Sequence, residues 1–182
     1  IGHNRYSTTG SSSWQNAQPV YGSVGDEGFA LGHNGNLTNT ADLAASLGML
    51  PGFVPPKSAV DSTTDSALVA ELISRAWPVE RRSDGRELEI ALEAVLPTLE
   101  GGFSFVLMDD SRLIGARDPH GFWPLVIGRL EGGGWVLASE SAALDLVGAH
   151  YVRDVQPGEM VVIDATGLRR EVRWAEPEPK LC

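Results

Sequence analysis

The 182-residue sequence has little cysteine, few basic side chains and no long apolar run. Its single cysteine, Cys182, excludes an internal disulfide framework and a cysteine-rich zinc site. Fourteen Lys and Arg stand against 24 Asp and Glu, and the resulting net charge of -10 disfavours a general nucleic-acid or anionic-membrane surface. No apolar run approaches the ~20 residues that a membrane helix needs. We therefore expect a cytoplasmic protein with neither a nucleic-acid nor a membrane partner.

The composition is that of a folded protein, because 42% of the residues are hydrophobic and 21% are charged. The length predicts one domain with a sizeable core. The chain opens on Ile1-Gly2-His3 without a methionine and closes on Leu181-Cys182 without a terminal signal. These ends predict a fragment of a longer protein.

The apolar pattern changes from helical to strand spacing along the chain. A short helix is predicted after Asn39, with Asn39 as its cap and Gly48 just past its end. Two longer helices follow, one starting at Asp65 and one carrying Leu88 to Leu99 on its apolar face. The predicted strands are Phe29–Leu31, Phe103–Met108, Leu113–Ala116, Leu125–Gly128, Trp135–Ala138, Met160–Asp164 and Leu168–Arg173, with a short helix at Ser141–Val147. This order predicts an α+β fold.

Two short segments have the composition of turns. Asn34-Gly35 tolerates positive φ, which predicts a tight turn at the end of the first strand. Asp118-Pro119-His120-Gly121 has the residues of a type I turn, and Asp118 is interpreted as an acid that stabilises that turn. The four histidines lack metal-ligand spacing and are predicted to be structural.

Three polar features suggest a site for a free amino acid. The guanidinium of Arg5 suits a carboxylate, because it donates two parallel hydrogen bonds, and Asp65 suits an ammonium group. The amide of Asn34 and the backbone N–H of Gly35 could both donate to one developing oxyanion. Each residue also has a structural explanation, as a surface charge, a turn or a helix start.

Five segments together resemble the amidophosphoribosyltransferase family of class II glutamine amidotransferases, in order and spacing over essentially the whole chain. They are Gly2–Gly10 followed by Trp14–Pro19, then His33–Asn39, Thr64-Asp65-Ser66, Ala116–Phe122 and Ala138-Ser139-Glu140. The resemblance implies an N-terminal-nucleophile hydrolase fold, in which two antiparallel sheets lie between layers of helices (αββα). Here that fold is expected to be incomplete at its N-terminus.

The resemblance also implies roles for single residues. Arg5 falls where the family binds the α-carboxylate of glutamine, and Thr8 falls on the loop that closes over it. Asn34 and Gly35 fall on the oxyanion hole, and Asp65 on the α-amino contact. The family nucleophile is an N-terminal cysteine whose own α-amino group acts as the base, and no cysteine of this chain occupies that position.

Further expectations concern the division of the chain into domains and the parts of the protein outside it. Residues 1–176 are expected to form the glutaminase domain, and residues 177–182 to begin the link to a phosphoribosyltransferase domain that would bind 5-phosphoribosyl-1-pyrophosphate and Mg²⁺. Pro179-Lys180-Leu181-Cys182 resembles the linking segment of members with a [4Fe–4S] cluster, so Cys182 is a candidate ligand. The full-length protein is expected to be a homo-oligomer.

Three alternatives remain open. The chain could belong to another class II glutamine amidotransferase, of the glutamine–fructose-6-phosphate transaminase or asparagine synthetase type. It could instead be a non-catalytic glutamine-binding domain, or a general α+β binding module that does not respond to glutamine.

Overall fold

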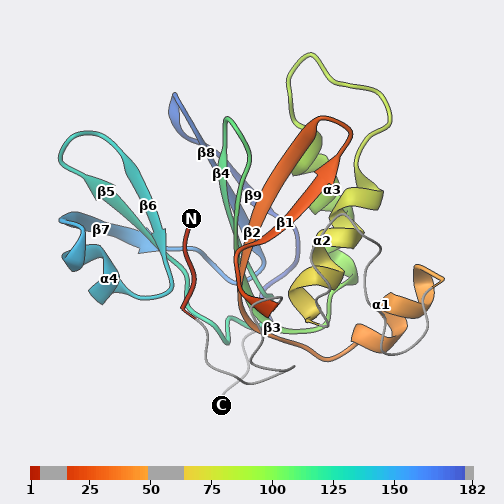
Figure 1. Ribbon diagram of the computed structural model, residues 1–182. Coiled ribbons are helices and arrows are strands. Elements are labelled where there is room, and N and C mark those ends of the chain that lie inside the picture. Colours follow the sequence, from red (N-terminus) through yellow and green to blue (C-terminus); the bar gives the residue numbers. More distant parts are fainter. Residues whose placement is uncertain (5–15, 49–63, 179–182) are drawn as a thin grey trace. The chain divides into compact units, whose positions relative to one another are not determined.

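The computed structural model describes residues 1–4, 16–48 and 64–178, and the chain forms two compact units. The first unit comprises Ile1–Gly32 and Leu37–Glu100, and the second comprises His33–Asn36 and Gly101–Cys182. Strand β2 (Glu27–Leu37) therefore contributes residues to both units. Figure 1 shows the order of the elements along the chain. No helix in the described part of the chain is long and apolar enough to cross a membrane.

A β-hairpin opens the first unit. Strand β1 (Val20–Val24) pairs antiparallel with β2, and Gly25, at φ 60°, lies in the turn between them. Phe29 and Leu31 are buried and alternate with less buried neighbours. This period-two burial is what a strand with one covered face requires.

The described part of the first unit also contains three helices. They are α1 (Thr40–Ser46), α2 (Asp65–Ala76) and α3 (Glu87–Val95), followed by a 3-10 turn at Leu96–Thr98. Helix α2 contacts both β1 and α3, and the rings of Phe29 and Trp77 stack with their centroids 6.0 Å apart. Helix α2 begins after Thr64, whose hydroxyl accepts the N–H of Ala67 at 3.4 Å and so caps the helix.

Asn39 precedes α1 as predicted, but its side chain does not cap that helix. Its amide instead donates to the carbonyl of Thr98 at 2.9 Å, and its oxygen accepts the N–H of Glu100 at 3.1 Å. The predicted capping role is therefore wrong, because a longer-range pair of backbone groups uses both ends of the amide. Gly48 follows the helix at φ 70°, as expected for a helix end.

The second unit is built mainly of strands. They are β3 (Gly101–Met108), β4 (Leu113–Arg117), β5 (Val126–Leu130), β6 (Trp135–Ala138), β7 (Ala149–Asp154), β8 (Glu159–Asp164) and β9 (Gly167–Arg173), with helix α4 (Ser141–Leu146) before β7. The hydrogen-bonded order of the larger sheet is β1-β2-β3-β4-β8-β9, and that of the smaller sheet is β6-β5-β7.

The two sheets pack face to face within the second unit. Leu125 and Ile127 of the smaller sheet form a buried cluster with Val161 of β8, and Val106 of β3 packs against that cluster. On the other face of the smaller sheet, Leu144 of α4 is buried with Val126 and Ala149. Helix, sheet and sheet therefore follow one another as layers in this unit.

The predicted α+β fold with two antiparallel sheets and flanking helices is confirmed. Strands β1 and β7 were not predicted, because Val20–Val24 contains glycine and serine and Ala149–Asp154 is mostly exposed. The predicted turn at Asn34-Gly35 is wrong, since both residues lie inside strand β2.

Candidate active site

Asn34 and Gly35 lie in the half of β2 that belongs to the second unit. Gly35 has a φ of 134°, a conformation that residues with a side chain rarely adopt. A Cβ added to Gly35 would lie 2.1 Å from the carbonyl oxygen of Gly102 and 2.8 Å from the Cα of Phe103. Only glycine permits this close contact with β3, because a side chain would clash with its backbone. The approach of β3 keeps Asn34-Gly35 within the strand, although these two residues are typical of a turn.

The side chain of Asn34 is half-buried, on the opposite side of the strand from His33 and Gly35. Within residues 1–4, 16–48 and 64–178, no residue makes a hydrogen bond with the Asn34 amide. Its two N–H donors are therefore available to a ligand. The donor pair expected from the sequence, an asparagine amide next to a glycine N–H, lies within strand β2.

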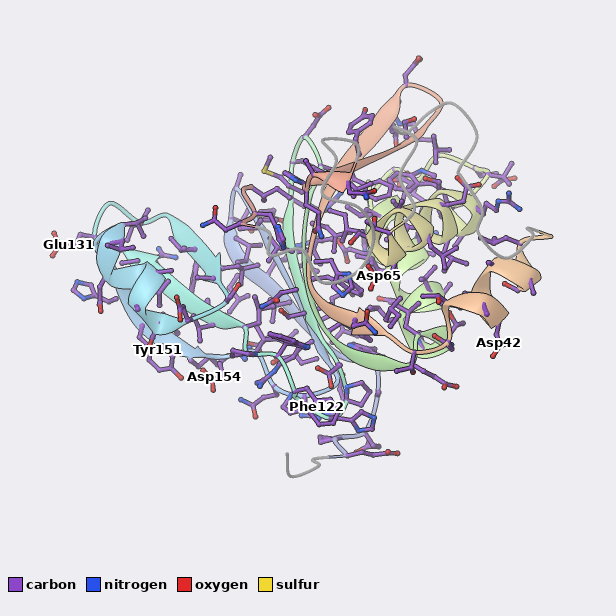
Figure 2. All side chains as sticks on the ribbon, turned by 60° about the horizontal axis from the view of Figure 1, so that its bottom comes forward. Asp42, Asp65, Phe122, Glu131, Tyr151 and Asp154 are labelled. Atoms are coloured by element: carbon purple, nitrogen blue, oxygen red, sulfur yellow. The ribbon has the colours of Figure 1, made fainter. Side chains whose placement is uncertain are left out.

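Asp65 is the first residue of α2 and belongs to the first unit (Figure 2). Its Oδ2 accepts the N–H of Leu37 at 3.2 Å, and its Oδ1 accepts the N–H of Ser66 at 2.9 Å. Leu37 is the last residue of β2, three positions after Asn34. These bonds fix the orientation of the carboxylate.

The remaining predicted site residues, Arg5, Thr8 and Cys182, lie outside the described residues. The structure therefore describes the local geometry of Asn34, Gly35 and Asp65, and their roles toward glutamine stay predictions. His33 is buried and packs on the ring of Phe105 with the centroids 4.8 Å apart. In the described ranges, no group of three or more His, Cys, Asp or Glu side chains could hold a metal ion.

The turn after β4 is more extensively bonded than its sequence indicated. The N–H of Gly121 donates to the carbonyl of Asp118 at 3.2 Å, which confirms the predicted turn. The Asp118 side chain is fully buried and also accepts the N–H of Phe103 at 3.2 Å. Arg117 donates to the carbonyls of Gly121, Trp123 and Val155 at 2.8–2.9 Å. The Asp-Pro-x-Gly pattern indicated the turn, but not these contacts to distant backbone.

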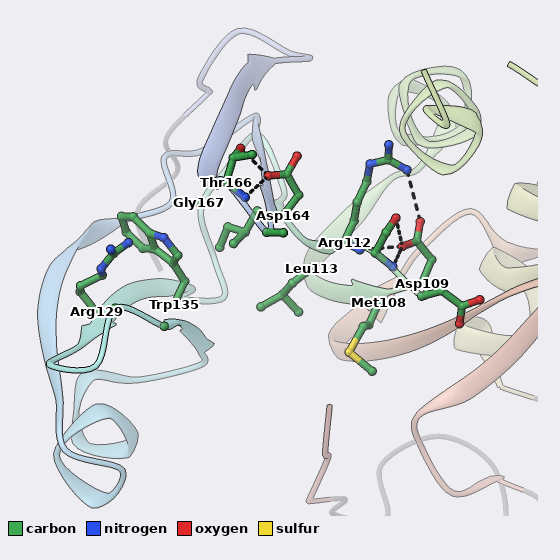
Figure 3. Close-up of a pocket in the computed structure, with 15 residues that line it drawn as sticks. Met108, Asp109, Arg112, Leu113, Arg129, Trp135, Asp164, Thr166 and Gly167 are labelled. Carbon is green, nitrogen blue, oxygen red and sulfur yellow. Dashed lines mark hydrogen bonds and ion pairs between the residues drawn. The ribbon is translucent and has the colours of Figure 1, made fainter. Parts of the chain in front are cut away.

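A cavity of about 520 Å³ lies elsewhere in the second unit, among the β3–β4, β5–β6 and β8–β9 hairpin turns (Figure 3). Asn34, Gly35 and Asp65, the predicted site residues that the structure describes, do not line it. Arg112 pairs with Asp109 at 3.7 Å, and the guanidinium of Arg129 lies 4.3 Å from the centre of the Trp135 ring. These contacts explain the polar lining as local stabilisation of the turns.

Asp164 at the rim of this cavity is strongly hydrogen-bonded. The hydroxyl and the N–H of Thr166 donate to its Oδ1 at 2.6 and 2.8 Å, and Arg169 lies 3.0 Å from its Oδ2. The hydrogen bonds from Thr166, helped by the charges of Arg169 and Arg112, hold the pKa of the Asp164 carboxyl below its ordinary value.

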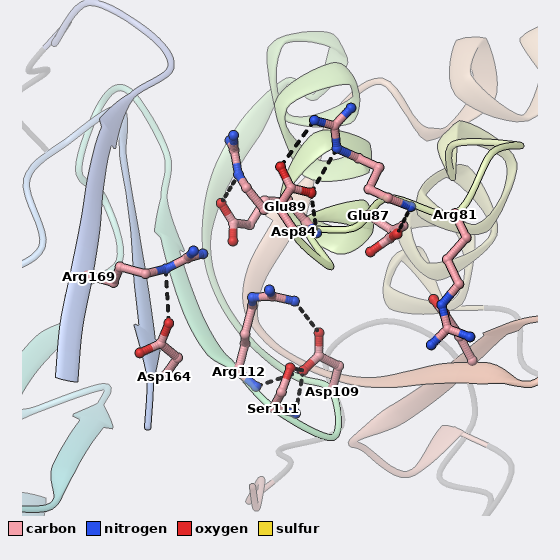
Figure 4. Close-up of polar contacts among 12 residues, drawn as sticks. Arg81, Asp84, Glu87, Glu89, Asp109, Ser111, Arg112, Asp164 and Arg169 are labelled. Carbon is pink, nitrogen blue, oxygen red and sulfur yellow. Dashed lines mark hydrogen bonds and ion pairs between the residues drawn. The ribbon is translucent and has the colours of Figure 1, made fainter. Parts of the chain in front are cut away.

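Another group of charges surrounds the start of α3 in the first unit (Figure 4). Arg82 binds Asp84 through two hydrogen bonds of 2.9 and 3.1 Å, which lower the pKa of Asp84. The buried Glu89 pairs with Arg86 at 2.9 Å. Glu87, also buried, accepts the N–H of Arg82 at 2.5 Å. These contacts order the segment that leads into the helix.

A third polar group lies along β7 to β9. Tyr151 donates its hydroxyl to Asp154 at 3.0 Å, which raises the pKa of the phenol (Figure 2). Arg153 binds both oxygens of Glu159 at 2.8 and 2.9 Å and also contacts Glu171. Its pKa is raised mainly by the hydrogen bonds to Glu159. These residues stabilise strand pairing and include none of the predicted site residues.

Comparisons with known proteins identify the family to which the chain belongs. The sequence model of the glutamine amidotransferase domain matches residues 3–146. The amidophosphoribosyltransferase of Mycobacterium leprae is 47% identical over all of this chain and 31% of its own length. That of Mycobacterium tuberculosis is 46% identical over all of this chain and 33% of its own length. The chain thus spans about a third of these curated relatives.

Two solved structures are similar to this chain over most of its length. The glutamine phosphoribosylpyrophosphate amidotransferase of B. subtilis, complexed with ADP and GMP, is 33% identical, with a TM-score of 0.76 over 95% of this chain and 34% of that chain. A structure described as the allosteric regulatory enzyme of purine biosynthesis is 34% identical, with a TM-score of 0.78 and the same coverage. The predicted N-terminal-nucleophile hydrolase fold is confirmed by these neighbours. Because the family model matches most of the chain and the fold agrees with these neighbours, the chain belongs to the glutamine amidotransferase domain family.

Proposed function

We propose that this chain is the glutamine-hydrolysing part of an amidophosphoribosyltransferase. The complete enzyme would release ammonia from glutamine and transfer it to 5-phosphoribosyl-1-pyrophosphate, giving 5-phosphoribosylamine, the first committed step of purine synthesis. Identities of 46–47% that run over the whole chain support this activity. Because the chain spans about a third of the length of those relatives, we assign the transfer step to a part of the enzyme outside this chain.

The observation that carries the proposal is the donor pair on β2. Gly35 lies in close contact with the backbone of β3, and the neighbouring Asn34 amide has no partner among the described residues. When a thiolate attacks the amide carbon of glutamine, negative charge develops on the carbonyl oxygen. The Gly35 N–H and the Asn34 amide would donate to that oxygen, and rigid donors of this kind lower the barrier most effectively.

The thiolate would come from a cysteine that precedes this chain, since Cys182 is its only thiol. The thiol proton would pass to the α-amino group of the same cysteine and then to the departing nitrogen. Ammonia leaves as the carbon–nitrogen bond breaks and a thioester remains. Water then hydrolyses the thioester to glutamate and restores the thiol.

Three residues would bind glutamine before the reaction. Asp65 would accept the α-ammonium group, and its two backbone hydrogen bonds orient it for this role. Arg5 would bind the α-carboxylate, and Thr8 would lie on the loop that closes over the substrate and excludes water.

The cofactors and partners are part of the same proposal. Mg²⁺ and 5-phosphoribosyl-1-pyrophosphate would bind in the phosphoribosyltransferase part, after a link that begins near residue 177. Cys182 would supply one of the four thiolates of a [4Fe–4S] cluster, and the other three would come from cysteines outside this chain. The full-length protein would be a cytoplasmic homo-oligomer.

The proposal is tested by assaying the full-length protein with glutamine and 5-phosphoribosyl-1-pyrophosphate, and separately with an ammonium salt in place of glutamine. We expect both nitrogen sources to give pyrophosphate. Asp65→Ala and Arg5→Ala should raise the KM for glutamine and leave the ammonium-dependent reaction intact.

The assay also separates the alternatives. Glutamine hydrolysis that is stimulated by fructose 6-phosphate, and not by the phosphoribosyl substrate, would assign the chain to an aminosugar-forming relative. Glutamine binding without ammonia release would identify a non-catalytic binding domain.

A further inference from the structure

The carboxylate of Asp118 is fully buried and links the turn after β4 to the start of β3. Its Oδ2 accepts the N–H of Phe103 at 3.2 Å, while the backbone N–H of Asp118 donates to the Phe103 carbonyl at 2.9 Å. Its Oδ1 accepts the N–H groups of His120 and Gly121 at 2.9 and 2.8 Å. Burial of a carboxylate is costly unless hydrogen bonds compensate it, so this group fixes the backbone around it.

The backbone that Asp118 holds is the backbone that contacts Gly35. The nearest atoms to a Cβ placed on Gly35 belong to Gly102 and Phe103, and they are main-chain atoms of β3. No side chain separates the two strands at this point. A shift of the Gly102–Phe103 peptide would therefore move the Gly35 peptide as well.

The turn also supports Gly102 from a second direction. A Cβ on Gly102 would lie 3.0 Å from the Cβ of Phe122 and 3.3 Å from a ring carbon of Trp123. Arg117 holds this segment by donating to the carbonyls of Gly121 and Trp123 at 2.9 and 2.8 Å. Phe122 is 39% exposed, so its contact with Gly102 contributes little to the buried core.

We propose that Asp118 and Phe122 are positioning residues for glutamine hydrolysis. They hold the Gly102–Phe103 backbone from two directions and so set the position of the Gly35 N–H, which donates to the oxyanion. This inference rests on the proposed function of Asn34 and Gly35. It assigns the segment Arg117–Trp123 a role in the rate of the reaction, in addition to its role as a turn.

The test compares Asp118→Asn with Asp109→Asn in the full-length protein. An amide has one acceptor oxygen and cannot accept all four N–H groups that Asp118 accepts, the fourth being that of Phe122 at 3.5 Å. Asp109 is a matched control at the opposite end of the same β3–β4 hairpin, where its Oδ1 accepts the N–H groups of Ser111 and Arg112 at 2.7 Å. Phe122→Ala is a second variant that keeps the buried hydrogen bonds.

We expect Asp118→Asn to lower kcat for glutamine hydrolysis about 10- to 100-fold with KM within about twofold, since small misplacements of catalytic groups cost this much. Phe122→Ala should lower kcat by a smaller factor, about three- to tenfold, because the hydrogen bonds of Asp118 remain. Asp109→Asn should leave kcat unchanged, even if it lowers the melting temperature as much as Asp118→Asn does. If Asp118→Asn does not fold, Phe122→Ala decides the outcome by the same criteria.

Wild-type kcat in a folded Asp118→Asn or in Phe122→Ala would overturn the inference, and so would an equal loss in Asp109→Asn. An increase in KM alone would also overturn it, because positioning of the oxyanion donor acts in the transition state. A wild-type protein that releases no ammonia from glutamine would instead refute the proposed function, and the inference with it.

Discussion

Replacement of Gly35 by alanine should destabilise the protein through a contact that glycine alone permits. The φ of 134° is itself unfavourable for a residue with a side chain, at a cost of about 1–3 kcal/mol. The added Cβ would lie 2.1 Å from a main-chain oxygen, which cannot move aside as a flexible side chain can. Overpacking of this kind costs about 1–3 kcal/mol more. The free energy of unfolding should therefore fall by about 2–6 kcal/mol.

Gly25→Ala is the matched control, because Gly25 lies in the turn that leads into the same strand. Its φ of 60° is also positive, but no atom lies within 4 Å of an added Cβ. We expect a cost of about 1–2 kcal/mol, from the backbone conformation alone. Comparison of the two variants isolates the close contact between Gly35 and β3.

Thermal unfolding of the full-length variants, followed by circular dichroism, measures this difference. Each kcal/mol lowers the melting temperature by about 2–4 °C for a domain of roughly 150–250 residues. Gly35→Ala should therefore melt several degrees below Gly25→Ala and should lose glutamine hydrolysis. Equal melting temperatures for the two variants would show that β2 and β3 are not in the close contact described.

Three other outcomes are expected. Asn34→Ala should lower kcat for glutamine hydrolysis by about 10²–10³ and leave KM nearly unchanged; an effect on KM alone would contradict the oxyanion role. The pKa of Asp164 is lower in the folded state, so its hydrogen bonds stabilise the fold at neutral pH, and this contribution is lost as the pH falls below about 3.8 and through the folded pKa. The stability difference between wild type and Asp164→Asn, measured by urea unfolding, should therefore shrink on acidification, and a constant difference would refute the assignment. Full-length protein purified without oxygen should contain about four irons per chain and lose them on Cys182→Ala; an active, iron-free wild type would exclude the cluster.

The sequence predicted the helices and most strands because their burial follows simple periodicity. Helix α2 starts at Asp65 as predicted, and β3 matches a continuous apolar run. Strands β1 and β7 were missed because half or more of their residues face away from a core. Propensity is weak for such strands, and tertiary pairing decides their structure.

The predicted backbone conformation around Asn34, and the predicted role of Asn39, were wrong because long-range contacts decide both. Asn34-Gly35 is typical of a tight turn, and only the approach of Gly102 shows why the strand continues there. The amide of Asn39 likewise bonds to Thr98 and Glu100, about sixty residues away. The buried contact of Asp118 with Phe103 spans fifteen residues and leaves no periodic signal.

The distribution of β2 between the two units limits how this chain can fold and be divided. The chain passes between the units three times, after Gly32, after Asn36 and after Glu100. A break at Glu100 would leave the second unit without its four residues from β2, and Gly102 without the strand that it contacts. Segments 1–100 and 101–182 should therefore not fold when produced separately, but should complement each other when mixed. Such pairing across more than sixty residues also predicts slow folding, since distant segments must meet before β2 is complete.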